Sequence, residues 1–149
     1  MANSDRIGAT GRDRAVPFPR KDAARSIAAP GSLRIRVARP GGGVLVVQAV
    51  GDLDAAGQHF LAEPVRQRLV GTASRVVLDL SQISFINTDG VGVLLEACQR
   101  AESRGKDLVL ISSPVVDRLL GLLGLAGRFR YARGPEEAAG GAHPAGASQ

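Results

Sequence analysis

The hydrophobic and polar positions of residues 33–39, Leu-Arg-Ile-Arg-Val-Ala-Arg, alternate along the chain. This period of two is typical of a β-strand that packs one face on a core and leaves the other in solvent, and we expect this strand at an edge of the sheet. Residues 44–50 form an almost continuous apolar run, which is typical of a more deeply buried strand. Because the glycine-rich segment 40–43 between them predicts a turn, the two strands are expected to pair as a hairpin.

Helical and strand patterns then alternate along the chain. The strongest helical pattern runs from Thr88 to Arg104, where apolar residues recur at the three- and four-residue spacing of one helix face. These residues are Val91, Leu94, Leu95, Cys98 and Ala101. A last helix is predicted from about Pro114, with apolar positions at Val116, Leu119, Leu120 and Leu123. Residues 76–80 and 108–111 are short apolar runs, and each predicts a buried strand.

Another helical segment follows residues 51–54 and ends before Gly71. Its apolar residues lie roughly on one face and are Phe60, Leu61, Val65 and Leu69. Pro64 lies within it. Because proline lacks a backbone N–H and its ring clashes with the preceding turn, we expect this helix either to kink at Pro64 or to begin late, near Ala62.

The short links between these segments favour parallel strands joined by right-handed crossovers. The predicted fold class is therefore α/β: a mixed open β-sheet in which an N-terminal hairpin precedes a parallel βαβαβα arrangement, with helices covering the sheet. The 149 residues are enough for one domain, which we place at residues 33–134. Residues 1–32 are predicted to be a disordered, arginine-rich arm, and residues 135–149 a disordered tail in which Pro135 could begin one helical turn.

Composition and charge narrow the classes of function. Aromatic residues make up 3% of the chain and tryptophan is absent, which disfavours a reader of single-stranded nucleic acid built on base stacking. The net charge of +5 is spread along the chain, so direct nucleic-acid binding is not expected. The single cysteine, Cys98, fits a core position, and no Cys/His spacing indicates a metal site or a cofactor. The N-terminal region has no long apolar run, so we expect a cytoplasmic protein without a membrane anchor.

The candidate functional residues follow two strands of the predicted parallel sheet. Residues 51–54, Gly-Asp-Leu-Asp, end one strand, and residues 87–91, Asn-Thr-Asp-Gly-Val, open the strongest helix. Because such loops meet at one edge of a sheet, Asp54 is expected near Asn87. A purely structural role fits the same residues, with Asn87 or Thr88 as the helix N-cap and Asp89 as a first-turn acid that complements the helix dipole.

Four separated blocks of the chain occur in the order found in the STAS domain family, which the sequence resembles over residues 33–134. The blocks are Gly51-Asp52-Leu53-Asp54, the segment from Val76 through Phe85-Ile86-Asn87-Thr88-Asp89-Gly90-Val91 to Leu95, Gly105-Lys106-Asp107-Leu108, and Ser113 to Leu120 continuing to Gly124. The resemblance implies a regulatory protein-binding domain. In the bacterial, anti-sigma-factor-antagonist branch it implies binding to an anti-sigma factor with a serine-kinase-type ATP-binding fold, which frees a sigma factor for transcription.

The resemblance also implies a phosphorylation switch in the loop that opens the helix. The implied partner-binding and regulatory residues are Asp54, Asn87, Thr88, Asp89, Gly90 and Val91. The family's loop reads Asp-Ser-Ser-Gly or Asp-Ser-Thr-Gly, so Asp89 stands at the usual phosphoacceptor position. A helix N-terminus accommodates a phosphate because its unpaired N–H groups and partial positive charge face it. Three interpretations follow: Asp89 imitates the phosphate, Thr88 takes over as acceptor, or the loop has lost regulation and kept binding.

Two other classes of function are left open by the sequence. A non-phosphorylatable scaffold subunit of a signalling complex, capable of self-association, would use the same domain without the switch. An enzyme would need acid–base chemistry or a bound cation between Asp54 and Asp89. Because no nucleophile–base pair accompanies these carboxylates, and His59 and His143 have no catalytic partner at a recognisable spacing, we expect no enzymatic activity.

Overall fold

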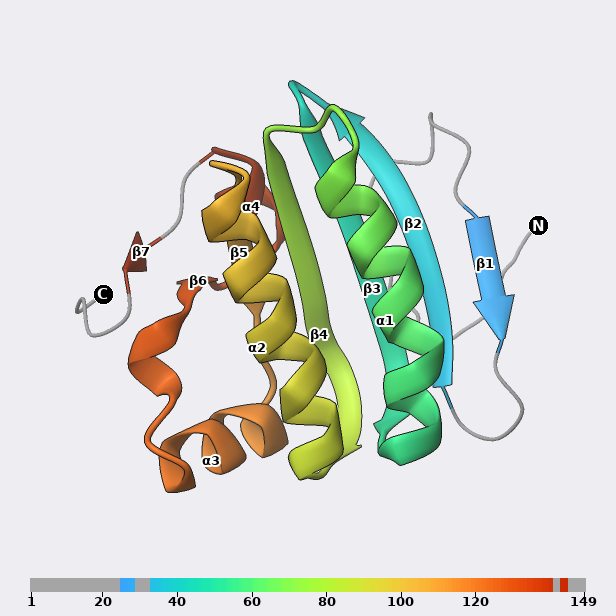
Figure 1. Cartoon of the computed structure of the whole chain (residues 1–149), viewed down its shortest axis with the longest axis vertical. Helices are drawn as coiled ribbons and strands as arrows, with labels where there is room; N and C mark the ends of the chain where they lie inside the picture. Colours follow the sequence, from blue (N-terminus) through green and yellow to red (C-terminus); the bar gives the residue numbers. More distant parts are fainter. Residues whose placement is uncertain (1–24, 29–32, 141–142, 145–149) are drawn as a thin grey trace.

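A seven-stranded mixed sheet forms the centre of the fold in this computed structural model, which describes residues 25–28, 33–140 and 143–144. The strands lie in the order of their labels: β1 (Arg25–Ala28), β2 (Leu33–Gly41), β3 (Val44–Leu53), β4 (Arg75–Ile86), β5 (Asp107–Ile111), β6 (Arg130–Ala132) and β7 (His143–Pro144). Neighbours from β3 to β6 are parallel, and the other pairs are antiparallel. The α/β class and the hairpin followed by parallel strands are thus confirmed (Figure 1).

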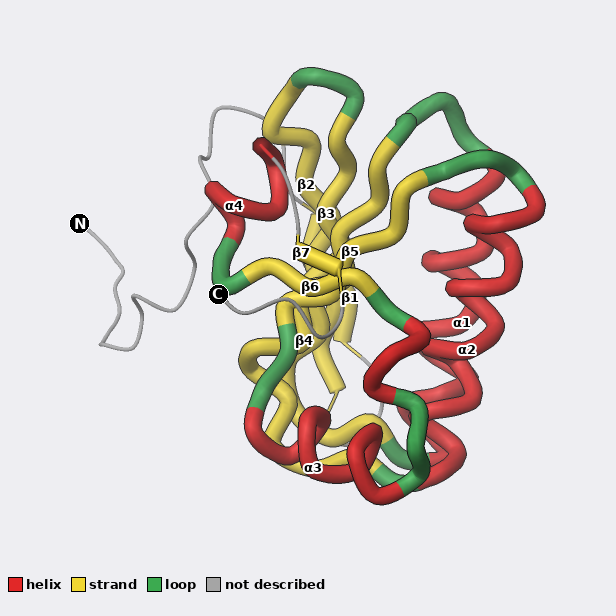
Figure 2. The backbone as a smooth tube through the Cα atoms, turned by 90° about the vertical axis from the view of Figure 1, so that its left-hand side faces the viewer, coloured by secondary structure: helices red, strands yellow, loops and turns green. Residues whose placement is uncertain are grey.

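The helices lie on both sides of this sheet and at one end of it. They are α1 (Ala55–Val70), α2 (Thr88–Ser103), α3 (Pro114–Leu122) and α4 (Pro135–Gly140). Figures 1 and 2 show α1 and α2 side by side on one face, α4 on the opposite face, and α3 at the end where α1 and α2 begin. The predicted strand–helix order is confirmed from β2 to α3, whereas β6 was not predicted.

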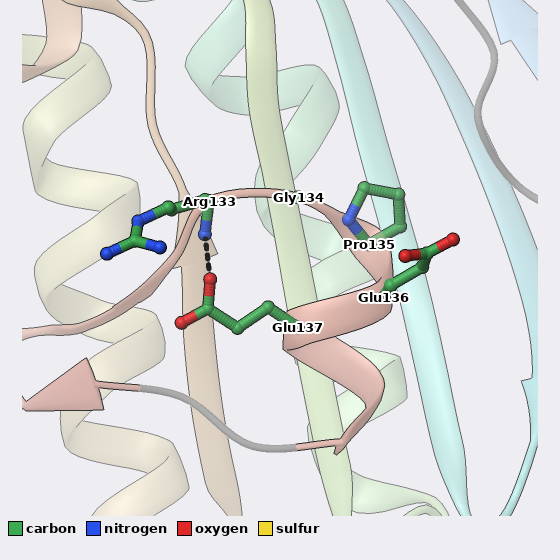
Figure 3. Close-up of a pocket in the computed structure, with 5 residues that line it drawn as sticks. All are labelled: Arg133, Gly134, Pro135, Glu136 and Glu137. Carbon is green, nitrogen blue, oxygen red and sulfur yellow. Dashed lines mark hydrogen bonds between the residues drawn. The ribbon is translucent and has the colours of Figure 1, made fainter. Parts of the chain in front are cut away.

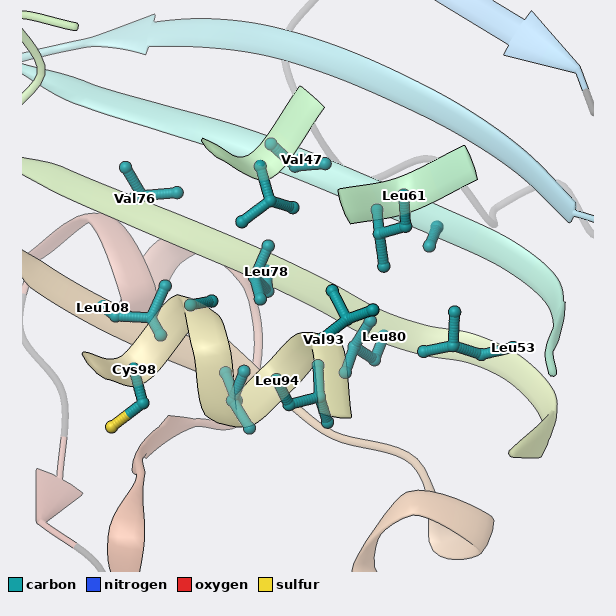
Figure 4. Close-up of a cluster of buried hydrophobic side chains, with 14 of the residues drawn as sticks. Val47, Leu53, Leu61, Val76, Leu78, Leu80, Val93, Leu94, Cys98 and Leu108 are labelled. Carbon is teal, nitrogen blue, oxygen red and sulfur yellow. The ribbon is translucent and has the colours of Figure 1, made fainter. Parts of the chain in front are cut away.

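The main core fills the space between the sheet and the helices α1 and α2 (Figure 4). Leu78 and Leu80 of β4 and Leu61 of α1 have no exposed surface, and Leu94 of α2 is equally buried. A smaller apolar cluster lies on the other face, where Val77 and Val109 pack with Ala138 of α4. Because both faces are covered, the central strands are apolar on both sides, as their continuous apolar runs predicted.

The predicted edge position of residues 33–39 is wrong. Residues 25–28 pair antiparallel with β2, from Arg25 opposite Val37 to Ala28 opposite Arg34. The outer edge of β2 offers unpaired N–H and C=O groups, and a short extended segment satisfies them at little steric cost. The predicted disordered arm therefore contains one strand, and its other residues lie outside the described part of the chain.

The predicted disordered tail likewise contains structure, since α4 spans Pro135–Gly140 and β7 follows at residues 143–144. Ala138 is 1% exposed, and the Arg75 guanidinium donates to the carbonyl oxygens of Ala138 (2.8 Å) and Ala139 (3.3 Å). These bonds satisfy carbonyl groups at the carboxyl end of α4. In an isolated helix of this length, such groups have no partner other than water. The helix is longer than the single turn expected at Pro135, because the body of the domain supplies its partners.

Two helix predictions also need correction. Of the two alternatives at Pro64, the late start near Ala62 is wrong, because α1 begins at Ala55 and includes Pro64. One N–H is lost at Pro64, but Leu61 and Val65 on either side are 0% and 2% exposed, so their burial offsets the missing hydrogen bond. Leu123 does not share the buried face of α3: it follows the last helical residue and is 43% exposed.

An ion-pair network joins α1 to α2. The Arg66 guanidinium donates to both carboxylate oxygens of Glu96, at 2.6 and 3.1 Å, and Arg100 donates to Glu96 at 2.7 Å. The hydrogen bond from Arg66 is the main reason that the pKa of Glu96 falls to about 2. The network therefore holds an ionised carboxylate between two helices.

A Glu96→Gln variant is expected to lose stability in a pH-dependent manner. Because the pKa of Glu96 is lower in the folded than in the unfolded chain, its stabilising effect is complete above about pH 5 and disappears as the pH falls towards 2. Urea unfolding at several pH values measures this effect. The difference in free energy of unfolding between wild type and variant should shrink as the pH is lowered through this range, whereas a difference that stays constant would contradict the assignment.

Candidate functional site

The two loops predicted to carry function are neighbours at the carboxyl end of the parallel strands. β3 and β4 run side by side with Leu53 opposite Ile86, and the Asn87 N–H donates to the Leu53 carbonyl oxygen at 3.4 Å. α1 and α2 begin directly after these strands, so their N-termini lie at the same end of the sheet (Figure 1). The structure thus brings Asp54 close to segment 87–90.

Each of the two helices begins with the same capping arrangement. Asp54 is the N-cap of α1 and accepts a hydrogen bond from the Gly57 N–H at 3.0 Å. Asn87 is the N-cap of α2 and accepts one from the Gly90 N–H at 3.2 Å. Both N-caps have extended backbones, and each side-chain oxygen pairs one of the N–H groups that a helix start leaves open. Asn87, not Thr88, is therefore the N-cap.

Gly90 and Gly57 allow the helix starts to lie directly against the backbone of the preceding loop. A Cβ atom on Gly90 would overlap the Leu53 carbonyl oxygen and lie 2.8 Å from Leu53 Cγ. A Cβ atom on Gly57 would lie 2.7 Å from the Asp52 carbonyl oxygen. Gly57 was not among the predicted site residues, although the chain repeats the spacing of an Asx residue followed three positions later by glycine, at 54–57 and 87–90.

Only part of segment 87–91 faces solvent. Thr88 and Asp89 are exposed and Asn87 is half-buried, whereas Gly90 is buried. Val91 is 2% exposed and belongs to the main core. Val91 therefore packs in the core beneath the start of α2, and the exposed side chains of the segment are those of Thr88 and Asp89.

The charged residues at this surface are acidic. Asp89 lies in the first turn of α2, where a carboxylate is stabilised by the partial positive charge of the helix N-terminus. Asp54 lies at the start of the neighbouring helix, with its carboxylate engaged by Gly57. The described residues contain no group of three or more His, Cys, Asp or Glu side chains that could hold a metal ion.

The side chains of Asp79 and Cys98 are both buried. Asp79 is 1% exposed; it accepts hydrogen bonds from the Ser81 N–H (3.0 Å) and hydroxyl (2.6 Å) and from Gln48 (3.3 Å). Cys98 is buried, and burial raises the pKa of its thiol, which disfavours the reactive thiolate. The Asp79 carboxylate thus accepts hydrogen bonds from Ser81 within β4 and from Gln48 of β3, and Cys98 fills the core as predicted.

The hollows described on the surface lie away from this site. One is lined by Arg133, Gly134, Pro135, Glu136 and Glu137, where the Arg133 N–H donates to the Glu137 carboxylate at 3.0 Å (Figure 3). Another lies beside the amino ends of β4 and β5 and is lined by Gly42, Val44, Ser74, Arg75, Asp107, Ala139 and Gly140. Neither includes a residue of segment 87–91. None of the described helices is long and apolar enough to cross a membrane.

Comparison with known proteins places these features in context. A family model for the STAS domain matches residues 36–138. Osmosensory protein A of Mycobacterium tuberculosis is 34% identical over 76 residues, covering 51% of this chain and 48% of that protein. The anti-sigma F factor antagonist of Paenibacillus polymyxa is 30% identical over 89 residues, covering 56% of this chain and 73% of that protein. The chain thus spans about half the length of the first relative and about three quarters of the second.

Solved structures show the same fold. An anti-sigma factor antagonist from Mycobacterium paratuberculosis superimposes with a TM-score of 0.63 at 24% identity, covering 75% of this chain and 95% of that one. The anti-sigma factor antagonist SpoIIAA in its unphosphorylated form gives a TM-score of 0.60 at 20% identity, covering 70% of this chain and 91% of that one.

Proposed function

The chain belongs to the STAS domain family, as the sequence resemblance predicted, and from this premise we propose that it is a regulatory protein-binding module of the anti-sigma-factor-antagonist type. Its partner in this proposal is an anti-sigma factor with a serine-kinase-type ATP-binding fold. Binding would free a sigma factor for transcription. The Paenibacillus polymyxa relative, named an anti-sigma F factor antagonist, supports this class of partner.

The observation that carries the proposal is the construction of segment 87–90. The Asn87 cap and the close approach of Gly90 to Leu53 hold the start of α2 rigidly, while Thr88 and Asp89 remain exposed. A preorganised, exposed helix start loses little conformational entropy when a partner closes on it. Segment 87–90 is therefore suited to protein binding even though aspartate occupies the position of the family's usual phosphoacceptor.

We further propose that the loop has lost the phosphorylation switch at position 89 and kept binding. An aspartate carries one negative charge, against about −1.5 to −2 for a phosphate, and it lacks the phosphate's three acceptor oxygens and bulk. Asp89 also sits on a helix N-terminus, which offsets part of its charge locally. In this proposal the partner tolerates Asp89, and the interaction persists in the presence of ATP. The module itself has no catalytic turnover.

A Thr88→Tyr variant tests the proposed binding surface. Thr88 is exposed at the start of α2, so a bulky side chain should leave the fold intact and obstruct a partner. Calorimetric titration against the kinase-type anti-sigma factors of the source organism should show at least about a tenfold loss of affinity. The matched variant Ser103→Tyr, exposed at the other end of the same helix, should bind like wild type. Equal affinities for both variants would contradict the proposed surface.

A further inference from the structure

The carboxyl-terminal part of β4 contains a β-bulge that reverses the direction of the Phe85 side chain. Gly51 of β3 pairs with Ile83, but the next residue, Asp52, pairs with Phe85, so Ser84 is an extra residue in β4. The Ser84 hydroxyl lies 3.4 Å from the Gly51 carbonyl oxygen and 3.3 Å from Asp52 Oδ1. These contacts hold the bulge closed against the neighbouring strand. Bulges of this kind re-aim side chains next to functional sites.

The bulge exposes Phe85 and leaves the nearby Ile83 and Ile86 buried. In a regular strand, alternation from the buried Ile83 would place Phe85 inside and Ile86 outside. Instead Ile83 and Ile86 are 4% and 8% exposed, and Phe85 is 49% exposed. Large apolar residues with comparable exposure elsewhere in the described chain are Val70, Leu122 and Leu123, so Phe85 is the aromatic member of this set. The chain contains only four phenylalanines, and this one faces solvent.

The position of Phe85 and the charge of the neighbouring segments indicate which kind of partner surface fits it. Phe85 lies three positions before Thr88, a span of at most about 11 Å along an extended chain. Every charged residue in segments 51–54 and 84–91 is acidic: Asp52, Asp54 and Asp89. An exposed aromatic ring whose adjoining segments carry only acidic charges complements an apolar pocket with a basic rim.

We propose that Phe85 is the apolar anchor of the partner interface and that it inserts into an apolar pocket rimmed by Lys or Arg on the anti-sigma factor. This inference rests on the proposed function and adds to it the chemistry of the partner's surface. The bulge at Ser84 is then a positioning feature, since it directs the ring outward beside segment 87–90. Aromatic side chains provide large contact area at low entropic cost and dominate the binding energy of many interfaces.

Titration of the anti-sigma factor with the full chain and with Phe85→Ala and Val70→Ala variants tests this inference. Val70 is 57% exposed at the far end of α1, so it controls for general loss of exposed apolar surface. We expect Phe85→Ala to weaken binding by at least about 30-fold and Val70→Ala by less than about threefold, with unchanged urea midpoints for both. The affinity of wild type should also fall as salt is raised from about 50 to 500 mM, because the rim contacts are ionic.

The outcomes separate this inference from the proposed function. If wild type binds and Phe85→Ala binds within about threefold of it, the anchor is overturned while the function stands. If both exposed-residue variants lose affinity equally, the anchor is also overturned. An affinity that does not change with salt overturns the basic rim. If wild type binds no kinase-type anti-sigma factor, the proposed function fails and the anchor fails with it.

Discussion

A Gly90→Ala variant is expected to lose at least about 3 kcal/mol of its free energy of unfolding. The added Cβ would lie 2.8 Å from Leu53 Cγ and 2.9 Å from Ile86 Cγ1, and it would overlap the Leu53 carbonyl oxygen. Two of these contacts belong to buried side chains and the third to backbone, so none can move away cheaply. The start of α2 would have to shift from β3, and the Asn87 cap would be strained with it.

Gly92→Ala is the matched control for this prediction. It lies in the same helix two residues later, and a Cβ there meets nothing within 4 Å. Because alanine has the higher helix propensity, this variant should be neutral or more stable by up to about 1 kcal/mol. Urea denaturation of both variants measures the contrast. A Gly90→Ala protein as stable as wild type would mean that the close packing of α2 on β3 is not required.

An Asp89→Ser variant is expected to become a substrate of the kinase-type anti-sigma factor, whereas wild type is not phosphorylated. The substitution restores a hydroxyl at the exposed first turn of α2, where a helix N-terminus stabilises the phosphate that forms. Asn87 still caps the helix, so the fold should be unaffected. Intact mass spectrometry after incubation with the anti-sigma factor, ATP and Mg²⁺ measures the added phosphate.

A double variant, Thr88→Ala with Asp89→Ser, locates the modified residue. It should be phosphorylated like Asp89→Ser alone, because the acceptor is the new serine. Phosphate on the wild-type chain, lost in a Thr88→Ala variant, would show instead that Thr88 has taken over as acceptor. That result would contradict the proposal that the switch is lost.

The central strands were predictable because burial on both faces leaves a continuous apolar run in the sequence. The two long helices were predictable because burial on one face leaves apolar residues at a spacing of three and four. Residues 88–104 show this best, since the apolar positions of α2 are those that reach the core. The start of α1 was not predictable from the same pattern. Pro64 argues against a continuous helix locally, and only the burial of Leu61 and Val65 against the sheet overrides it.

The site was predictable in its location and less so in its construction. Strand ends in a parallel sheet bring residues 51–54 and 87–91 together whatever their sequence. Which of these residues face solvent depends on packing that has no local signal: Val91 is apolar on the helix face, yet only the structure separates it from Thr88 and Asp89.

The bulge at Ser84 is a property of pairing with β3, and a single strand's sequence does not contain its partner's register. Strand β1 was missed, and α4 was predicted only as a single turn at Pro135, because the stability of both short segments comes from the rest of the domain.

In the proposed function, this chain binds a kinase-type anti-sigma factor through segment 87–90 without a phosphorylation switch at position 89. Side-by-side calorimetric titration of wild type and Asp89→Ser, with and without ATP, tests it most directly. We predict that wild type binds with the same affinity in both conditions, and that Asp89→Ser binds without ATP and loses at least about tenfold in affinity with it. Binding by Asp89→Ser but not by wild type would contradict the claim and show that Asp89 imitates a phosphate.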